Sequence, residues 1–325
     1  MRRRQLLVTT GMGLALASPS YAQRGFPERA IRIVVAFAAG GPTDVMARRL
    51  AEGLTQRLGQ PVIVENRTGN AGGIGSAEVA RARPDGYTLL VAVSSSHAIL
   101  PTLMQRPPFD PVADFAGVAV LGVVPMALAV HPNFPAQSFK EWLEVVRARP
   151  GQYVYGSSGV GGISHFAAEL LMREAPGVSI TQVPYRGASA ALQDLIAGQV
   201  PMVVDTLASV VPAQAGGQVR ILATFAERRP PGLPDTPTAI EEGLSGMVAN
   251  TYNALLAPAG TPPEILRLLN RATLQTLAEP AFVEFLRANS IDTRPDSTPE
   301  NTMEYVRSEL EKWRPVIQAT NMRIN

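Results

Sequence analysis

The sequence contains no cysteine and only three histidines, so it lacks the side chains from which most disulfide, thiolate and metal sites are built. Without cysteine there is no disulfide framework, no thiolate nucleophile and no cysteine metal cluster. The histidines, His97, His131 and His165, are far apart and show no H-x-x-x-H spacing. A metal site made of neighbouring histidines is therefore not expected, and we expect no cofactor.

The signatures of common enzymes and nucleotide-binding proteins are also missing. The chain has no G-x-x-x-x-G-K-[ST], H-E-x-x-H or G-x-S-x-G motif. One enzyme hypothesis stays open, a hydrolase in which Ser158, His165 and Asp205 act together. A serine on a binding loop and a histidine in the first turn of a helix explain the same residues without catalysis. We therefore expect that the protein is not an enzyme.

The first 22 residues are typical of an export signal. Three arginines, Arg2 to Arg4, precede an apolar stretch from Leu6 to Ala17, and Ser20 and Ala22 supply small residues for cleavage. The stretch is shorter than the ~20 residues that span a bilayer. We expect cleavage and a periplasmic location, by the Sec or the twin-arginine route. A disordered tail or an uncleaved anchor is the alternative.

The charge balance gives no reason to expect a nucleic-acid partner. The chain has 29 basic and 27 acidic residues, and removal of the signal takes three arginines and no acid, which leaves 26 against 27. The mature protein would have no basic excess. The other long uncharged run, Phe115 to Val130, contains Gly117, Gly122 and Pro125. Two consecutive buried strands or strand-like crossings fit it better than a membrane span.

Short β-branched runs alternate with helical patterns, which predicts an α/β fold with parallel sheets. Ile31 to Phe37 reads as a strand, and Thr43 to Gly59 as a capped helix with apolar residues at every fourth position. A second set of such units begins at Met126. Near Ala249 to Leu256 the chain is expected to return to the first set. Thr261 is predicted to cap the long helix that follows.

Two loops of small residues, one from Phe37 to Asp44 and one from Ser157 to His165, each follow a strand and precede a helix. Such loops let backbone N–H groups approach a ligand, and the helix N-terminus adds a partial positive charge. If the two loops face each other, both can hold one anion. We expect Asp44 to cap its helix facing away from the anion, or to act through water. The predicted ligand-binding residues are Phe37, Ala38, Gly40, Gly41, Pro42, Thr43 and Asp44 in the first loop and Ser157, Ser158, Gly161, Ser164 and His165 in the second.

Residues at the ends of other strands are further candidates, because ligands of open α/β sheets bind at the carboxyl ends of strands. Ser94 and Ser95 follow the third strand, and Tyr185, Asp205 and Thr206 end strands of the second set. A turn, a cap or a solvated surface side chain explains each of these residues equally well.

Several segments, taken together and in order, resemble the Bug-type substrate-binding proteins of tripartite tricarboxylate transporters. These segments cover nearly all of the mature chain and are Ile31–Asp44, Val64–Arg67, Gly72–Gly75, Pro84–Leu89, Asp110–Phe115, Val183–Gly187 and Leu256–Pro262. The sequence departs from the family pattern at Ala36, at Phe166 and at Val204–Thr206. Because of these departures, the identity of a family member's ligand does not transfer to this chain, whereas the two-lobed fold that closes on a ligand does.

The resemblance implies a type II periplasmic binding protein, an α/β fold of two βα lobes joined by two crossing hinge strands. We expect one lobe to comprise residues 23–123 and 252–325, and the other residues 124–251. The family function implies a monomer that closes on a small carboxylate and delivers it to membrane permease subunits. In the family the carboxylate is held mainly by backbone amides and ordered waters between the two loops. The alternative is a solute sensor that feeds a signalling receptor.

Overall fold

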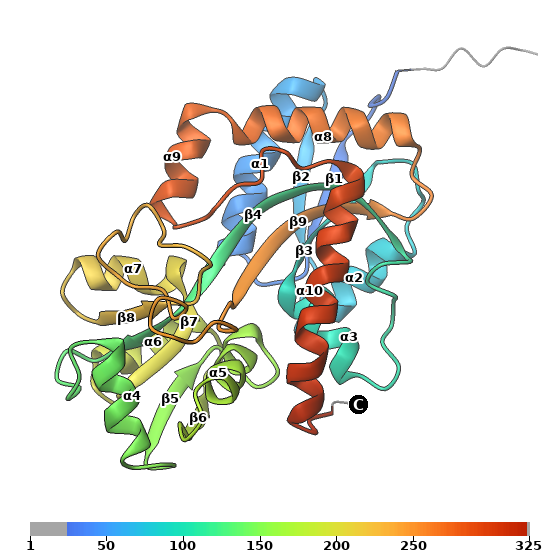
Figure 1. Cartoon of the computed structure of the whole chain (residues 1–325). Helices are drawn as coiled ribbons and strands as arrows, with labels where there is room; N and C mark the ends of the chain where they lie inside the picture. Colours follow the sequence, from blue (N-terminus) through green and yellow to red (C-terminus); the bar gives the residue numbers. More distant parts are fainter. Residues whose placement is uncertain (1–24, 324–325) are drawn as a thin grey trace, which may run out of the picture.

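Two long strands run diagonally through the molecule, and the other elements are arranged around them (Figure 1). The computed structural model describes residues 25–323, so the predicted export signal, residues 1–22, lies outside the described residues. One group of elements comprises β1 (Ile31–Val35), α1 (Pro42–Leu58), β2 (Val62–Asn66), η1 (Asn70–Gly72), α2 (Gly73–Ala80), β3 (Thr88–Val93), η2 (Ser95–Ile99), α3 (Leu100–Leu103), α8 (Pro263–Leu277), α9 (Pro280–Ala288) and α10 (Pro299–Ala319). The other comprises α4 (Phe139–Arg147), β5 (Tyr153–Ser157), α5 (Ile163–Glu174), β6 (Ile180–Pro184), α6 (Ala188–Ile196), β7 (Met202–Thr206), α7 (Leu207–Ala215) and β8 (Arg220–Thr224). The crossing strands are β4 (Phe115–Val130) and β9 (Asn250–Pro258).

The strands form one mixed sheet in the order β2-β1-β3-β9-β4-β7-β5-β6, with β8 also paired to β4. Strands β1, β2 and β3 are parallel to one another, and so are β5, β6 and β7. The crossing strands run antiparallel to their neighbours and to each other. The expectation of parallel sheets therefore holds for β1, β2 and β3 and for β5, β6 and β7, and it is wrong for the pairings of β4, β8 and β9, which are antiparallel. The run from Phe115 to Val130 is one strand rather than two.

The partner of β4 changes near its middle. Residues Phe115 to Pro125 pair with β9, whereas Met126 to Val130 pair with β7 and β8. Pro125 has no N–H to donate, and proline fits a sheet best where a regular ladder is interrupted. This is the two-lobe architecture of a type II periplasmic binding protein. The change of partner lies close to the predicted lobe boundary at residues 123–124, and the boundary itself stays a prediction.

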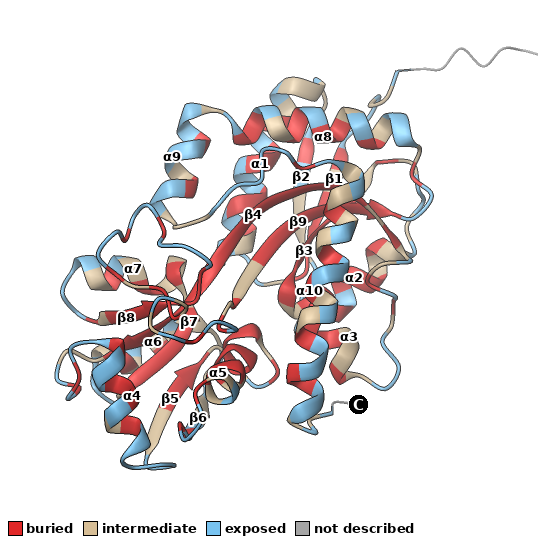
Figure 2. Ribbon diagram, in the orientation of Figure 1, coloured by how far each residue is buried: buried red, intermediate tan, exposed pale blue. Residues whose placement is uncertain are grey.

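Helices cover both faces of the sheet in each lobe, and the central strands are buried (Figure 2). In the first lobe, α1, α8 and α9 pack on one face, and α2 and α10 pack on the other. In the second lobe, α4 and α5 lie on one face, and α6 and α7 on the other. The end of α10 crosses between lobes: Trp313, Val316 and Ile317 belong to the core that α5 forms.

Local sequence signals explain where most helices begin and end. Pro42 occupies the first turn of α1, and Gly59 ends that helix in the left-handed conformation, with φ of 67°. Ser138 accepts a hydrogen bond from the N–H of Glu141 at the start of α4. The predicted cap at Thr261 is wrong. Its hydroxyl donates to the carbonyl of Pro258, and α8 begins at Pro263.

A close contact holds the segment after α9 against β4. The N–H groups and carbonyls of Val123 and Asp292 form a reciprocal pair at 2.8 and 2.9 Å. A Cβ atom built on Gly122 would overlap the Cγ2 methyl of Ile291. The absence of a side chain at residue 122 therefore lets this segment lie directly on the crossing strand.

We predict that Gly122→Ala lowers the free energy of unfolding by about 1–3 kcal/mol, because the added methyl group must displace Ile291 in a packed region. Gly232→Ala is the matched control, since nothing lies within 4 Å of a Cβ built there. Urea denaturation of both variants measures the effect. Equal stability of the two variants would contradict the packing described for Gly122.

Candidate ligand-binding site

A cleft of about 670 Å³ lies between the two lobes. The starts of α1, α6 and α7 and the end of α9 form its walls, and β4 and β9 contribute to its floor. Its size is within the range of small-molecule sites. The lining residues are Ala38, Ala39, Gly40, Gly41, Pro42, Val45, Val124, Arg186, Gly187, Ala188, Ser189, Ala190, Leu192, Ala208, Ser209, Asn253, Phe285, Asn289 and Ile291.

The electrostatics of this cleft favour an anion. The lining contains one charged side chain, Arg186, and no carboxylate. Three helices begin at the cleft, and none of them has a side-chain cap. The first N–H groups of a helix have no acceptor within the helix and carry partial positive charge. These N–H groups and the guanidinium therefore supply donors to a negatively charged ligand.

Asp44 holds the first loop in shape rather than lying in the cleft. Its carboxylate is 2% exposed and accepts hydrogen bonds from the N–H of Gly40 at 2.8 Å, from Arg48 Nε at 2.9 Å and from Asn66 Nδ2 at 2.9 Å. Asn66 Nδ2 also donates to the carbonyl of Phe37. Burial alone would raise the pKa of Asp44. The hydrogen bonds from Arg48, Gly40 and Asn66 outweigh burial, so the pKa is lowered and the carboxylate stays charged.

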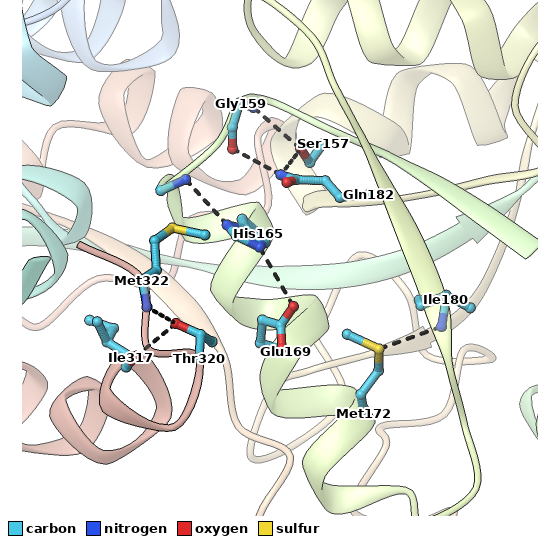
Figure 3. Close-up of polar contacts among 11 residues, drawn as sticks. Ser157, Gly159, His165, Glu169, Met172, Ile180, Gln182, Ile317, Thr320 and Met322 are labelled. Carbon is cyan, nitrogen blue, oxygen red and sulfur yellow. Dashed lines mark hydrogen bonds and ion pairs between the residues drawn. The ribbon is translucent and has the colours of Figure 1, made fainter. Parts of the chain in front are cut away.

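The second predicted loop uses most of its polar groups internally. The N–H of Ser158 donates to Ser164 Oγ at 2.9 Å, and the N–H of Gly161 donates to His165 Nδ1 at 3.2 Å. Gln182 Nε2 donates to both Ser157 Oγ and the carbonyl of Gly159 (Figure 3). None of the residues from Ser157 to His165 lines the 670 Å³ cleft. The loop approaches the other lobe at Gly161, where a Cβ would lie 3.2 Å from the side chain of Leu103.

The side chains of the hydrolase hypothesis are not arranged as a triad. His165 Nδ1 accepts from Gly161, and His165 Nε2 faces Glu169 at 3.6 Å (Figure 3). The Ser158 hydroxyl bonds to the Ser164 hydroxyl at 2.7 Å. Within residues 25–323, no hydrogen bond joins Ser158 to His165.

The predicted strand-end residues lie around the cleft rather than on its surface. Ser94 is buried and accepts from the N–H of Tyr252 at 3.2 Å, and Ser95 begins the next helical turn. The hydroxyl of Tyr185 donates to Asp194 Oδ2 at 2.8 Å. Burial and this carboxylate raise the pKa of Tyr185 to about 12.

Asp205 lies outside the cleft and holds Ser209, one of the lining residues, by a hydrogen bond. Its side chain is 4% exposed, and its Oδ1 accepts from the N–H of Thr206 at 2.7 Å and from Ser209 Oγ at 3.3 Å. Thr206 and Ser209 also share a hydrogen bond between their hydroxyls. Burial raises the pKa of Asp205 to about 6, and the hydrogen bonds offset only part of that rise.

Four of the predicted site residues, Ala38, Gly40, Gly41 and Pro42, line the cleft, and the other thirteen do not. The role of each in ligand binding stays a prediction. Arg186 was weighed from the sequence both as a partner for a carboxylate and as a solvated surface charge, and it lines the cleft. Sequence reasoning missed several other lining residues, among them Ser189, Asn253 and Asn289. Gly187 and Ala188 follow a strand and open a helix, so the rule that predicted the first loop could also have found them. Asn253 and Asn289 have no comparable sequence signal.

Comparison with known proteins identifies the family. The family model described as tripartite tricarboxylate transporter family receptor matches residues 46–322. The chain belongs to this family. BugT of Bordetella pertussis is 34% identical to the receptor over 328 residues, which cover 100% of both chains.

Two solved structures of similar proteins contain carboxylates. An R. palustris protein solved with adipate is 32% identical to the receptor, with a TM-score of 0.82 over 92% of this chain and 99% of that one. MatC of Rhodopseudomonas palustris, solved with malate, is 34% identical, with a TM-score of 0.79 over 90% of this chain and 100% of that one. The two-lobe fold of the receptor is therefore that of periplasmic binding proteins.

We predict that Asp44 and Asp205 make the free energy of unfolding change with pH in opposite directions. The pKa of Asp44 is lowered by folding, so its charge stabilises the fold above its ordinary pKa, and this contribution is lost as the pH falls through the lowered value. The pKa of Asp205 is raised to about 6. Between its unfolded pKa and about 6 the folded state binds more protons than the unfolded state, so stability falls as the pH rises.

Asp205→Asn should therefore gain stability relative to the parent by up to roughly 3 kcal/mol between pH 4 and pH 7. Asp44→Asn should lose stability relative to the parent as the pH rises toward about 4. Denaturant unfolding across a pH series measures both effects. Parallel pH profiles for the parent and Asp205→Asn would contradict the account of Asp205.

Proposed function

We propose that this receptor works in the periplasm, where it captures a small organic carboxylate in the cleft between its lobes and delivers it to a tripartite tricarboxylate-type permease. The observation that supports the proposal most is the charge of the cleft, where three uncapped helix starts and Arg186 meet and no carboxylate belongs to the lining. The malate and adipate bound to similar proteins are anions of this class.

A carboxylate fits the first loop in a specific way. The N–H of Gly40 is taken by Asp44, and the N–H of Gly41 donates to the carbonyl of Ala38 at 3.3 Å. The N–H groups of Thr43 and Asp44, in the first turn of α1, have no acceptor within the helix and carry its partial charge. They are the donors that we assign to the ligand. Apolar side chains such as Val124, Leu192 and Phe285 would pack against its carbon chain.

Other cavities near the crossing strands suit an anion less well. One of about 460 Å³ is lined by the carboxylates Glu227, Asp292 and Asp296 and by two arginines, Arg228 and Arg294, and another of about 350 Å³ by Asp296, Glu304 and Arg294. In each cavity the carboxylates outnumber the arginines by one, whereas the 670 Å³ cleft has an arginine and no carboxylate in its lining, so the cleft suits an anion better. The first of them lies on the opposite face of β4, since it contains Val123 and Pro125, whereas the 670 Å³ cleft contains Val124.

We propose that the protein works outside the cytoplasmic membrane as a monomer, and that it binds its ligand without catalysing a reaction. Within residues 25–323, no helix combines the length and apolar composition that crossing a bilayer requires. Closure of the lobes around the crossing strands would enclose the ligand and form the surface that the permease subunits recognise. The arrangement of Ser158 and His165 supports binding rather than hydrolysis.

We predict that at least one small carboxylate raises the melting temperature of the purified protein in a dose-dependent way. The protein is first unfolded and refolded to remove any retained ligand. A panel of dicarboxylates, tricarboxylates, acidic amino acids and aromatic acids is then tested. A ligand at 100 times its dissociation constant should add about 2.7 kcal/mol of stability. No shift with any acid would contradict carboxylate capture.

We predict that Gly41→Val weakens binding of that carboxylate at least tenfold, or by about 1.4 kcal/mol. The φ of −74° at Gly41 is open to valine, although the Cβ would lie only 3.3 Å from the carbonyl oxygen of Ala38, and the side chain would occupy the loop where the ligand approaches α1. Gly232→Val, in a loop outside the cleft, is the matched control. Titration calorimetry measures both affinities. Unchanged affinity in Gly41→Val would contradict the assignment of the ligand to the first loop.

A further inference from the structure

Asn253 lies at the floor of the cleft, in the middle of the crossing strand β9. It pairs with Val93 of β3 and with Gly122 of β4. Its neighbour Tyr252 packs on the face covered by α10, so Asn253 lies on the opposite face, with α1 and α9. The side chain therefore shares the cleft with the first loop.

The amide of Asn253 has no hydrogen-bond partner among the residues that the structure describes. The side chain is 6% exposed, and its Oδ1 is buried and unpaired. The two half-buried polar side chains of the lining do have partners: Asn289 Nδ2 donates to the carbonyl of Phe285 at 2.8 Å, and Ser209 bonds to Asp205 and Thr206. A buried polar group without a partner is destabilising, so such groups usually have a functional reason.

We propose that Asn253 binds a hydroxyl group on the ligand, and hence that the receptor selects hydroxy acids over the corresponding acids without the hydroxyl. This inference rests on the proposed capture of a carboxylate in the same cleft. Oδ1 is an acceptor, and a carboxylate, which has no proton to donate, leaves it unpaired. A ligand that carries a donor in addition to its carboxylate can pair this atom once the amide turns it toward the cleft.

The chemistry of the cleft favours a hydroxyl over an ammonium group as that donor. No acidic residue lines the cleft, so an ammonium ion would be desolvated without a counter-charge. A hydroxyl both donates and accepts. It can satisfy either end of the amide, because the terminal torsion of asparagine is soft and turns Oδ1 or Nδ2 toward the cleft.

Pairs of acids that share a carbon skeleton and differ by one hydroxyl test the inference. Suitable pairs are malate with succinate, and citrate with propane-1,2,3-tricarboxylate. Aspartate, which carries an ammonium group in place of the malate hydroxyl, tests the choice of donor. Titration calorimetry with the whole protein should show that the hydroxylated member of a pair binds at least tenfold more tightly. It should also bind more tightly than the amino acid.

Two variants with side chains of nearly equal shape, threonine and valine, test whether Asn253 causes the preference for the hydroxylated acid. Asn253→Thr keeps a hydroxyl on the strand and should keep part of the preference, whereas Asn253→Val should bind both members of a pair equally. Thermal unfolding shows whether each variant is folded, and the comparison of acids on the parent protein does not depend on either variant.

Equal binding of both members of each pair by the parent would overturn the inference and leave carboxylate capture standing. Persistence of the preference in Asn253→Val would also overturn it. Absence of binding by every acid would overturn the proposed function and this inference together.

Discussion

The antiparallel pairing of β4 with β9 is the constraint on which the rest of the structure depends. The two strands hydrogen-bond from Phe115 to Pro125 and from Asn250 to Pro258, and β4 alone continues into the sheet of the other lobe. The cleft opens between the lobes where these strands cross. The relative positions of the walls of the cleft are therefore set by a few residues near Pro125 and by the contact of the end of α10 with the other lobe. Any closing motion must be absorbed at these two places, because packed cores resist deformation.

The two faces of this crossing differ in charge. On one face, small residues, helix starts and Arg186 form a cleft without carboxylates. On the other, three carboxylates, Glu227, Asp292 and Asp296, and two arginines, Arg228 and Arg294, lie around a smaller cavity, which leaves an excess of one negative charge. Successive side chains of a strand point to opposite faces of the sheet. Val124 therefore faces the cleft, whereas its neighbours Val123 and Pro125 face the other cavity. A carboxylate is therefore directed to one face of the hinge by repulsion from the other as well as by attraction.

The local elements were predictable from the sequence because their signals are local. Alternating patterns located most strands and helices, and Gly59 marks the end of α1 as expected; Ser138 and Thr298 begin α4 and α10 by the same kind of local signal. The small-residue loop before α1 was predicted because the order of strand, loop and helix along the sequence shows that the loop adjoins a helix N-terminus. Asp44 was expected to cap its helix facing away from the anion or to act through water; it is buried and faces away from the cleft, but its three hydrogen bonds hold the loop rather than cap the helix.

Tertiary contacts account for what the sequence did not predict. The end of α10, with Trp313 and Ile317, packs in the core of the other lobe, although it is far from that lobe in sequence. Asn253 is a polar residue in an otherwise apolar strand, and only the fold shows that it lies in the cleft. The internal bonds of the loop from Ser157 to His165 likewise depend on Gln182, on the adjacent strand.

A crystal structure of the protein with a bound carboxylate tests the central claim most directly. The account predicts that one carboxylate group lies in the 670 Å³ cleft, within hydrogen-bonding distance of the first N–H groups of α1, with the lobes closed around it. A ligand bound in the cavity beside Glu227 and Asp292, or a ligand in the cleft without contact to α1, would contradict the account.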